Sequence, residues 1–141
     1  MEQIEEQTLD LAPTNALTVY HVTPTRNLPA ILAAGLSPDR SASSLAAVFL
    51  AADKATAQNY ACMKDEPCVL LEVTLRPVEH TLGPDNYELP AALELLDADD
   101  LARFGLAPDA QWYDCTWQIS LEMCQQVACY TPIAPANIKV I

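Results

Sequence analysis

Three short apolar runs, separated by two segments of helical periodicity, dominate the first half of the chain. The runs are 16–22 (ALTVYHV), 45–51 (LAAVFLA) and 68–75 (CVLLEVTL). Their β-branched and aromatic residues favour strands, and apolar runs of this length are typical of strands that are largely buried. The segment 28–36 is predicted to be a helix that Gly35 stops, and 54–63 a helix that Asp53 caps. This alternation predicts an α+β domain.

The second half of the chain gives weaker signals. Residues 91–104 show helical periodicity before a glycine, and 127–130 and 138–141 indicate one or two strands interrupted by prolines. The segment 113–123 fits a strand or a helix, and its aromatic and β-branched content favours strand-like structure up to Ile119. Residues 1–15 are polar, acidic and without a regular period, which predicts a flexible arm before a single domain at 16–141.

The charge balance limits the kind of partner. The 141 residues include 19 acidic and 7 basic side chains, for a net charge of −12. Nucleic-acid binding draws much of its affinity from basic side chains on phosphates, so such a chain is a poor candidate for a broad DNA or RNA surface. A small molecule or a protein is the expected partner. No run approaches eighteen apolar residues and the start is acidic, so we expect no membrane span, no signal peptide and a cytoplasmic location.

The five cysteines form no CxxC pair, and an odd number cannot close completely into internal disulfides. We expect most of them to be reduced and buried. The spacing of Cys62 and Cys68 permits a bridge without establishing one. His21 and His80 lie far from any closely spaced ligand pair, so no metal site is expected.

Three blocks of the sequence carry a family resemblance. YHVTPTRNLPAILAAGL (20–36) places a histidine near a strand end and Gly-Leu at a helix end, and AVFLAADKATAQNYA (47–61) ends a helix with tyrosine. QVACYTPIAPANIKVI (126–141) has the layout of a late strand followed by a proline segment. In these blocks the chain resembles the ADP-ribosyltransferase superfamily, in its diphtheria-toxin and poly(ADP-ribose)-polymerase branch. The resemblance covers 17–75 and, through a shorter pattern, 120–141. It implies one domain with two small sheets that form a split β-sandwich flanked by short helices.

The resemblance also implies a binding site for NAD, which serves as a substrate. The histidine that hydrogen-bonds a ribose corresponds to His21, and the backbone that holds the nicotinamide end corresponds to Val22, where the family usually has glycine. Thr23 matches the small hydroxyl residue. Phe49 takes the place of the tyrosine of the family's His-Tyr-Glu triad, and Tyr60 matches the tyrosine that sandwiches the nicotinamide ring. Aromatic stacking of this kind contributes roughly 0.5–1.5 kcal/mol beyond area burial.

The third triad position departs from the family, because Gln126 stands where relatives carry a catalytic glutamate. Cleavage of the nicotinamide–ribose bond develops positive charge on the ribose, which a carboxylate stabilises and glutamine does not. Losing such a group commonly lowers a rate about 10²–10³-fold. Glu122, four residues earlier, is an alternative carboxylate. Arg26 and Arg40 are expected either to face the pyrophosphate of NAD or to form ion pairs with nearby carboxylates.

The resemblance leads to three functional hypotheses. The first is an NAD-dependent ADP-ribosyltransferase that modifies a protein or small-molecule acceptor, whether as a toxin, an effector or a housekeeping enzyme. The second is a catalytically degenerate module that binds NAD, ADP-ribose or a protein partner. The third, the related RNA 2′-phosphotransferase, is least favoured because the chain lacks a cluster of arginines for the RNA phosphate.

Overall fold

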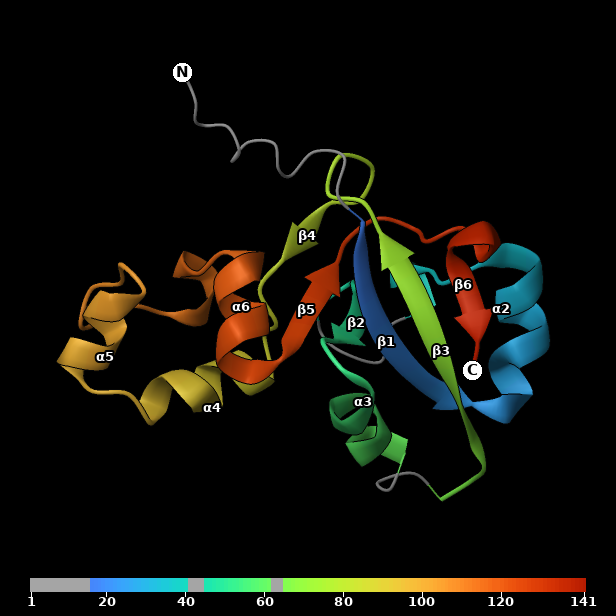
Figure 1. Ribbon diagram of the computed structural model, residues 1–141, viewed down its shortest axis with the longest axis horizontal. Helices are drawn as coiled ribbons and strands as arrows, with labels where there is room; N and C mark the ends of the chain where they lie inside the picture. Colours follow the sequence, from blue (N-terminus) through green and yellow to red (C-terminus); the bar gives the residue numbers. More distant parts are fainter. Residues whose placement is uncertain (1–15, 41–44, 62–64) are drawn as a thin grey trace.

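The structure is a computed structural model that describes residues 16–40, 45–61 and 65–141, the side chain of Arg40 excepted (Figure 1). The strands are β1 (Leu17–Pro24), β2 (Val48–Ala51), β3 (Cys68–Leu75), β4 (Leu82–Gly83), β5 (Gln126–Cys129) and β6 (Ile138–Val140). The α-helices are α2 (Leu28–Ala34), α3 (Lys54–Ala61), α4 (Glu88–Glu94), α5 (Ala98–Arg103) and α6 (Trp117–Cys124). Short 3-10 helices are η1 (Thr25–Asn27), η2 (Pro38–Arg40), η3 (Trp112–Asp114) and η4 (Pro135–Asn137). The predicted mixture of helices and strands is confirmed, and the predicted arm at 1–15 lies outside the described residues.

The strands form one open antiparallel sheet in the order β4-β5-β2-β1-β3-β6. β1 and β3 pair along eight residues, from Leu17↔Leu75 to Pro24↔Cys68. Between β1 and β2, however, the register among the described residues consists of the single pair Tyr20↔Ala51. Two separate small sheets were expected. The structure corrects this to one sheet, because that pair joins two three-stranded halves.

Side chains alternate across the sheet and define its two faces. Val19 and His21 of β1 lie on the face that α2 covers, together with Leu50 of β2. Tyr20 and Gln126 lie on the other face, since both are in register with Ala51. The main core lies on the α2 face. Its buried members are Val19, Ile31, Leu36, Val48, Leu50, Leu71, Val73, Leu75, Val127, Cys129, Ile133 and Ile138.

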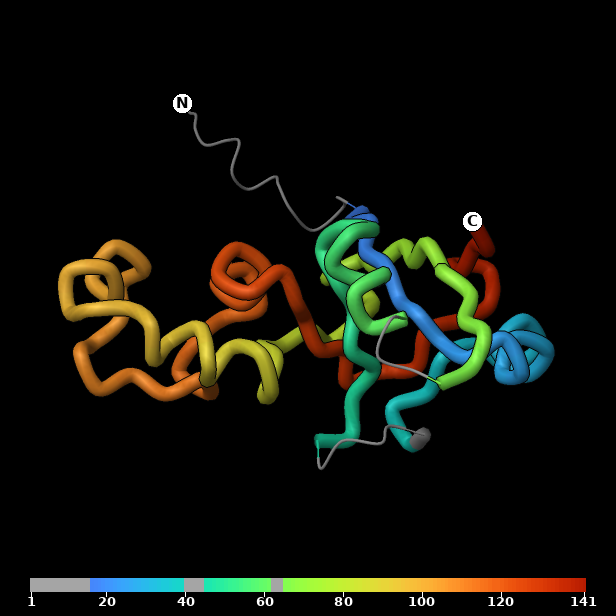
Figure 2. The backbone as a smooth tube through the Cα atoms, turned by 90° about the horizontal axis from the view of Figure 1, so that it is seen from below, coloured from blue at the N-terminus to red at the C-terminus, as the bar shows by residue number. Residues whose placement is uncertain are grey.

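Helices α4, α5 and α6 lie together beyond the β4 end of the sheet, and α2 lies at the opposite end (Figures 1 and 2). Helices α4, α5 and α6 have a second hydrophobic core of their own, centred on the buried Leu89, Leu93, Leu101 and Cys115. In α6, Trp117 and Leu121 pack against the sheet core, while Ile119 and Met123 pack against the helical core. The amphipathic faces of α6 therefore join the two cores.

Two predictions for this region are wrong. The single helix expected at 91–104 is divided, because Asp97 adopts an extended conformation and its carboxylate accepts from the Asp100 N–H at 2.9 Å to begin α5. The strand-like structure expected at 113–119 is η3 followed by α6. Thr116 caps α6 by accepting from the Ile119 N–H at 3.2 Å. Packing on both sides of α6 outweighs the β-propensity of its aromatic and branched residues.

No helix among the described residues has the length and apolar character needed to cross a bilayer. Cys68, Cys115, Cys124 and Cys129 are free thiols, and Cys62, whose spacing from Cys68 permits a bridge without establishing one, lies outside the described residues. Within those residues, no group of three or more His, Cys, Asp or Glu side chains is placed to hold a metal ion.

Candidate functional site

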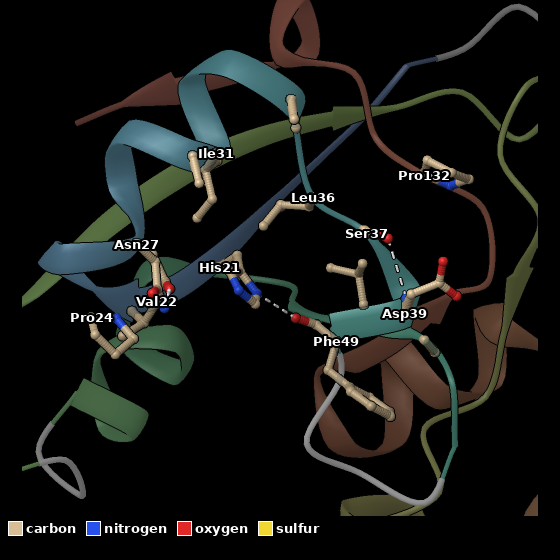
Figure 3. A pocket seen from close by; sticks show the side chains of 16 residues that line it. His21, Val22, Pro24, Asn27, Ile31, Leu36, Ser37, Asp39, Phe49 and Pro132 are labelled. Atoms are coloured by element: carbon tan, nitrogen blue, oxygen red, sulfur yellow. Dashed lines mark hydrogen bonds between the residues drawn. The ribbon is translucent and has the colours of Figure 1, made fainter.

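β1 and β2 separate immediately after Tyr20↔Ala51, and His21 lies at the point where they diverge. β1 runs on to Pro24 and stays paired with β3, so its other edge opens toward β2. The His21 imidazole reaches across this fork, and its Nδ1 lies 2.8 Å from the Phe49 carbonyl oxygen (Figure 3). A side-chain hydrogen bond thus follows the point where the strand pairing stops.

This contact indicates that one particular ring nitrogen carries a proton. A carbonyl oxygen only accepts hydrogen bonds, so Nδ1 must carry the proton. In the neutral ring Nε2 is then the acceptor, which suits a hydroxyl donor such as one on a ribose. The sequence predicted His21 at the end of a strand; β1 continues three residues farther, and the fork rather than the strand end defines the position.

The fork opens into a cavity of about 980 Å³, which we call the His21 cavity. Its volume lies at the upper end of the range of about 300–1,000 Å³ that is typical of ligand pockets. Strand β1 supplies His21 to Pro24, β2 supplies Val48 and Phe49, and α2 supplies an apolar wall (Figure 3). Thr23 is buried, and its hydroxyl accepts from the Asn27 amide at 3.2 Å, which holds the start of α2 against β1.

The far wall of the cavity depends on Gly35, which ends α2. Its backbone has φ 86° and ψ −169°, a conformation largely restricted to glycine. A Cβ at this position would lie 2.0 Å from the Ile133 carbonyl oxygen. This close approach lets Leu36 and Ile133 exchange two backbone hydrogen bonds of 2.9 Å. The Gly35-Leu36 pair therefore closes the cavity against the segment after β5.

A second, smaller pocket of about 200 Å³ lies on the other face of the sheet; we call it the Tyr60 pocket. It is lined by Thr56, Asn59, Tyr60, Glu88, Cys124 and Gln126. The Tyr60 hydroxyl donates to Glu88 Oε2 at 2.7 Å and accepts from Gln126 Nε2 at 3.2 Å. Three side chains from α3, α4 and β5 thus form one hydrogen-bonded row.

A buried network fixes this row. Ser120, which has no exposed surface, accepts from the Asp85 N–H at 3.0 Å and donates to the Gln126 carbonyl at 2.7 Å. The Asp85 carboxylate in turn accepts from the backbone N–H groups of Tyr87, Glu88 and Leu89 at the start of α4. The hydroxyl of Ser120 therefore holds the strand carrying Gln126 and the helix carrying Glu88 in one arrangement.

Burial governs the ionisation of the groups in and around the Tyr60 pocket. Burial, followed by the hydrogen bond to Glu88, raises the pKa of Tyr60, so its hydroxyl keeps its proton at neutral pH. Burial also raises the pKa of Cys124 to about 11 and raises the pKa of Asp85, against the backbone hydrogen bonds that lower it. The pocket therefore contains a neutral phenol and a neutral thiol.

The structure divides the sequence-predicted site residues into two groups. His21, Val22, Thr23 and Phe49 line the His21 cavity, whereas Tyr60 and Gln126 line the Tyr60 pocket. The two groups meet through β2: Phe49 is two residues from Ala51, roughly 7 Å along a strand, and Ala51 is in register with Gln126. The Phe49 carbonyl faces His21 while its ring points away from the imidazole (Figure 3).

The predicted cations lie differently. Arg26 makes a two-pronged ion pair with Glu66, at 2.7 and 3.2 Å, and lines neither pocket. Its side chain is 69% exposed, and the hydrogen bond to Glu66 raises the pKa of its guanidinium. The Arg40 side chain lies outside the described residues. Glu122, the alternative carboxylate, is exposed on α6 and lines neither pocket.

Sequence reasoning missed Glu88. The helix predicted at 91–104 begins only after Glu88, although Asp85 and Glu88 have the spacing of a helix-capping pair before an apolar run. That spacing predicts the start of α4. Nothing in it indicates that Glu88 would meet Tyr60 and Gln126, because that contact joins distant parts of the chain.

Comparisons with protein-family models, curated proteins and solved structures found no match to this chain.

Proposed function

We propose that this protein is an NAD-dependent ADP-ribosyltransferase that modifies a protein or small-molecule acceptor. The observation that carries the proposal is the fork at His21. There an imidazole lines a dinucleotide-sized cavity, and the Tyr60 pocket lies on the other face of the sheet, where Gln126 is in register with Ala51, two residues from Phe49. The proposal includes the fold: the two halves of the sheet, joined by one pair, correspond to the split sheets of that superfamily.

We place the ADP end of NAD in the His21 cavity and the nicotinamide end beside Val22 at the fork, where it reaches between β1 and β2 toward the Tyr60 pocket on the other face of the sheet. His21 Nε2 accepts from a ribose hydroxyl, and the apolar wall of α2 covers the adenosine. Asn27 and Ser37 supply neutral hydrogen-bonding groups near the phosphates. Arg26, engaged with Glu66, makes no contribution in this arrangement.

The charge of the chain favours a protein or small-molecule acceptor. With a net charge of −12, the molecule repels polyanions at long range. RNA 2′-phosphotransfer also requires cations for the RNA phosphate, and the described lining of both pockets contains no arginine or lysine. Nucleic acid is therefore the least favoured acceptor.

The test measures nicotinamide release from NAD by chromatography, with cell lysate as a source of acceptors, and NAD affinity by calorimetry. His21→Ala removes the whole imidazole. His21→Asn retains an amide donor for the Phe49 carbonyl but lacks Nε2. We expect both variants to lose at least about fivefold in NAD affinity, the value of one hydrogen bond, and His21→Asn to keep the native stability. The control is His80→Asn, because His80 is a buried histidine outside both pockets whose Nδ1 accepts from the Arg76 N–H. A native chain that neither binds NAD nor releases nicotinamide would overturn the proposal.

A second candidate function is NAD or ADP-ribose binding without turnover, which Gln126 favours because it supplies no negative charge. In that case the native chain binds NAD, His21→Asn weakens binding, and nicotinamide release begins with Gln126→Glu. The same assays therefore separate the two candidates.

A further inference from the structure

A carboxylate is linked to Gln126 through the Tyr60 hydroxyl, although position 126 itself carries none. Glu88, the first residue of α4, lines the Tyr60 pocket with its Oε2 2.7 Å from the Tyr60 hydroxyl. Gln126 Nε2 donates to the same hydroxyl at 3.2 Å. One phenol therefore separates the amide of Gln126 from the carboxylate of Glu88.

The position of Glu88 is built into the fold. The Asp85 carboxylate accepts from the Glu88 N–H, and the Asp85 N–H is bound by Ser120, whose hydroxyl also donates to the Gln126 carbonyl. The two hydrogen bonds of Ser120 are buried. Because one buried hydroxyl fixes both backbones, the Glu88 carboxylate keeps its place relative to Gln126.

We infer that Glu88 is a catalytic residue that supplies the negative charge missing at Gln126, with Tyr60 holding the carboxylate in place. This inference rests on the proposed function. Gln126 then hydrogen-bonds the ribose through its amide, and Glu88 provides electrostatic stabilisation from an adjacent element.

The reaction balances without any group beyond the substrates. The bond between ribose C1′ and the nicotinamide nitrogen breaks, and both electrons leave with the neutral nicotinamide. The positive charge that develops on the ribose is stabilised by the Glu88 carboxylate. An acceptor nucleophile, or water, forms the new bond to C1′ and releases its proton to solvent.

The test is Glu88→Gln, which keeps the size and the acceptor oxygen for Tyr60 but removes the charge. We expect kcat for nicotinamide release to fall about 10²–10³-fold, with NAD affinity from calorimetry within a few-fold of native. The matched control is Glu94→Gln on the same helix, since Glu94 is exposed and lines neither pocket. It should keep the native kcat.

Combining Glu88→Gln with Gln126→Glu moves the carboxylate from α4 to β5. The double variant should have a kcat at least about tenfold higher than that of Glu88→Gln alone. Native kcat in Glu88→Gln overturns the role of Glu88 and leaves the proposed function intact. A native chain that binds NAD without releasing nicotinamide also overturns it and selects the binding module. Absence of both binding and release overturns the inference together with the proposed function.

Discussion

Replacing Gly35 by alanine tests how the His21 cavity is closed. Two contributions to the loss of stability follow from the structure. The backbone conformation of φ 86° and ψ −169° costs a residue with a side chain about 1–3 kcal/mol. The new Cβ, 2.0 Å from the Ile133 carbonyl oxygen, also forces apart the two hydrogen bonds between Leu36 and Ile133. Each of those bonds contributes about 0.5–1.5 kcal/mol. We therefore expect Gly35→Ala to lose about 4 kcal/mol of unfolding free energy, a large share of the 5–15 kcal/mol typical of a domain.

The matched control is Gly105→Ala. Gly105 also has a positive φ, of 75°, but a Cβ there would meet no atom within 4 Å. Only the backbone cost of about 1–2 kcal/mol remains. Urea unfolding followed by circular dichroism gives the free energy of unfolding of both variants. The two are compared through their unfolding midpoints, with the same dependence of free energy on urea concentration for each. Equal losses in the two variants would refute the close contact between Gly35 and Ile133.

Two further predictions concern the Tyr60 pocket. Ser120→Ala removes the buried acceptor of the Asp85 N–H and should lower the free energy of unfolding in urea by about 1–3 kcal/mol. The control Ser37→Ala removes the acceptor of the exposed Asp39 N–H and should lower it by less than about 0.5 kcal/mol. Similar losses in the two variants would contradict the buried network. Burial raises the pKa of Cys124 from 9.0 to about 11, so at pH 8 its thiolate fraction is about 100-fold below that of an ordinary cysteine. Iodoacetamide should therefore modify Cys124 slowly in the folded protein, and faster as the pH rises toward 11. Mass spectrometry of the peptide that contains Cys124 measures the rate of modification. The same rate in urea as in buffer at pH 8 would exclude the raised pKa.

The sequence was most informative in the first half of the chain, where local signals and tertiary structure agree. The β-branched runs became β1, β2 and β3, and the glycine stop of α2 lies at the predicted residue. The residues grouped around His21 could be found because they follow one another along two strands. Their contacts form where those strands meet.

The second half depended on contacts between distant segments. Trp117 and Leu121 are compatible with a strand by propensity, but they lie one helical turn apart and both reach the sheet core, which favours the helix. The pairing of Glu88 with Tyr60 spans 28 residues, and that of Tyr60 with Gln126 spans 66. No local pattern encodes such distances, so the Tyr60 pocket emerged only from the fold.

The fork between β1 and β2 also has a mechanical consequence. Strands β1, β3 and β6 form one plate of the sheet and β4, β5 and β2 another, and the backbone seam between the plates is one residue pair wide. The hydrogen bond between the His21 imidazole and the Phe49 carbonyl joins the two plates beside this seam. A ligand that fills the fork would contact both plates and form a second connection between them. Binding would then stiffen the relative motion of the two plates without rearranging either one.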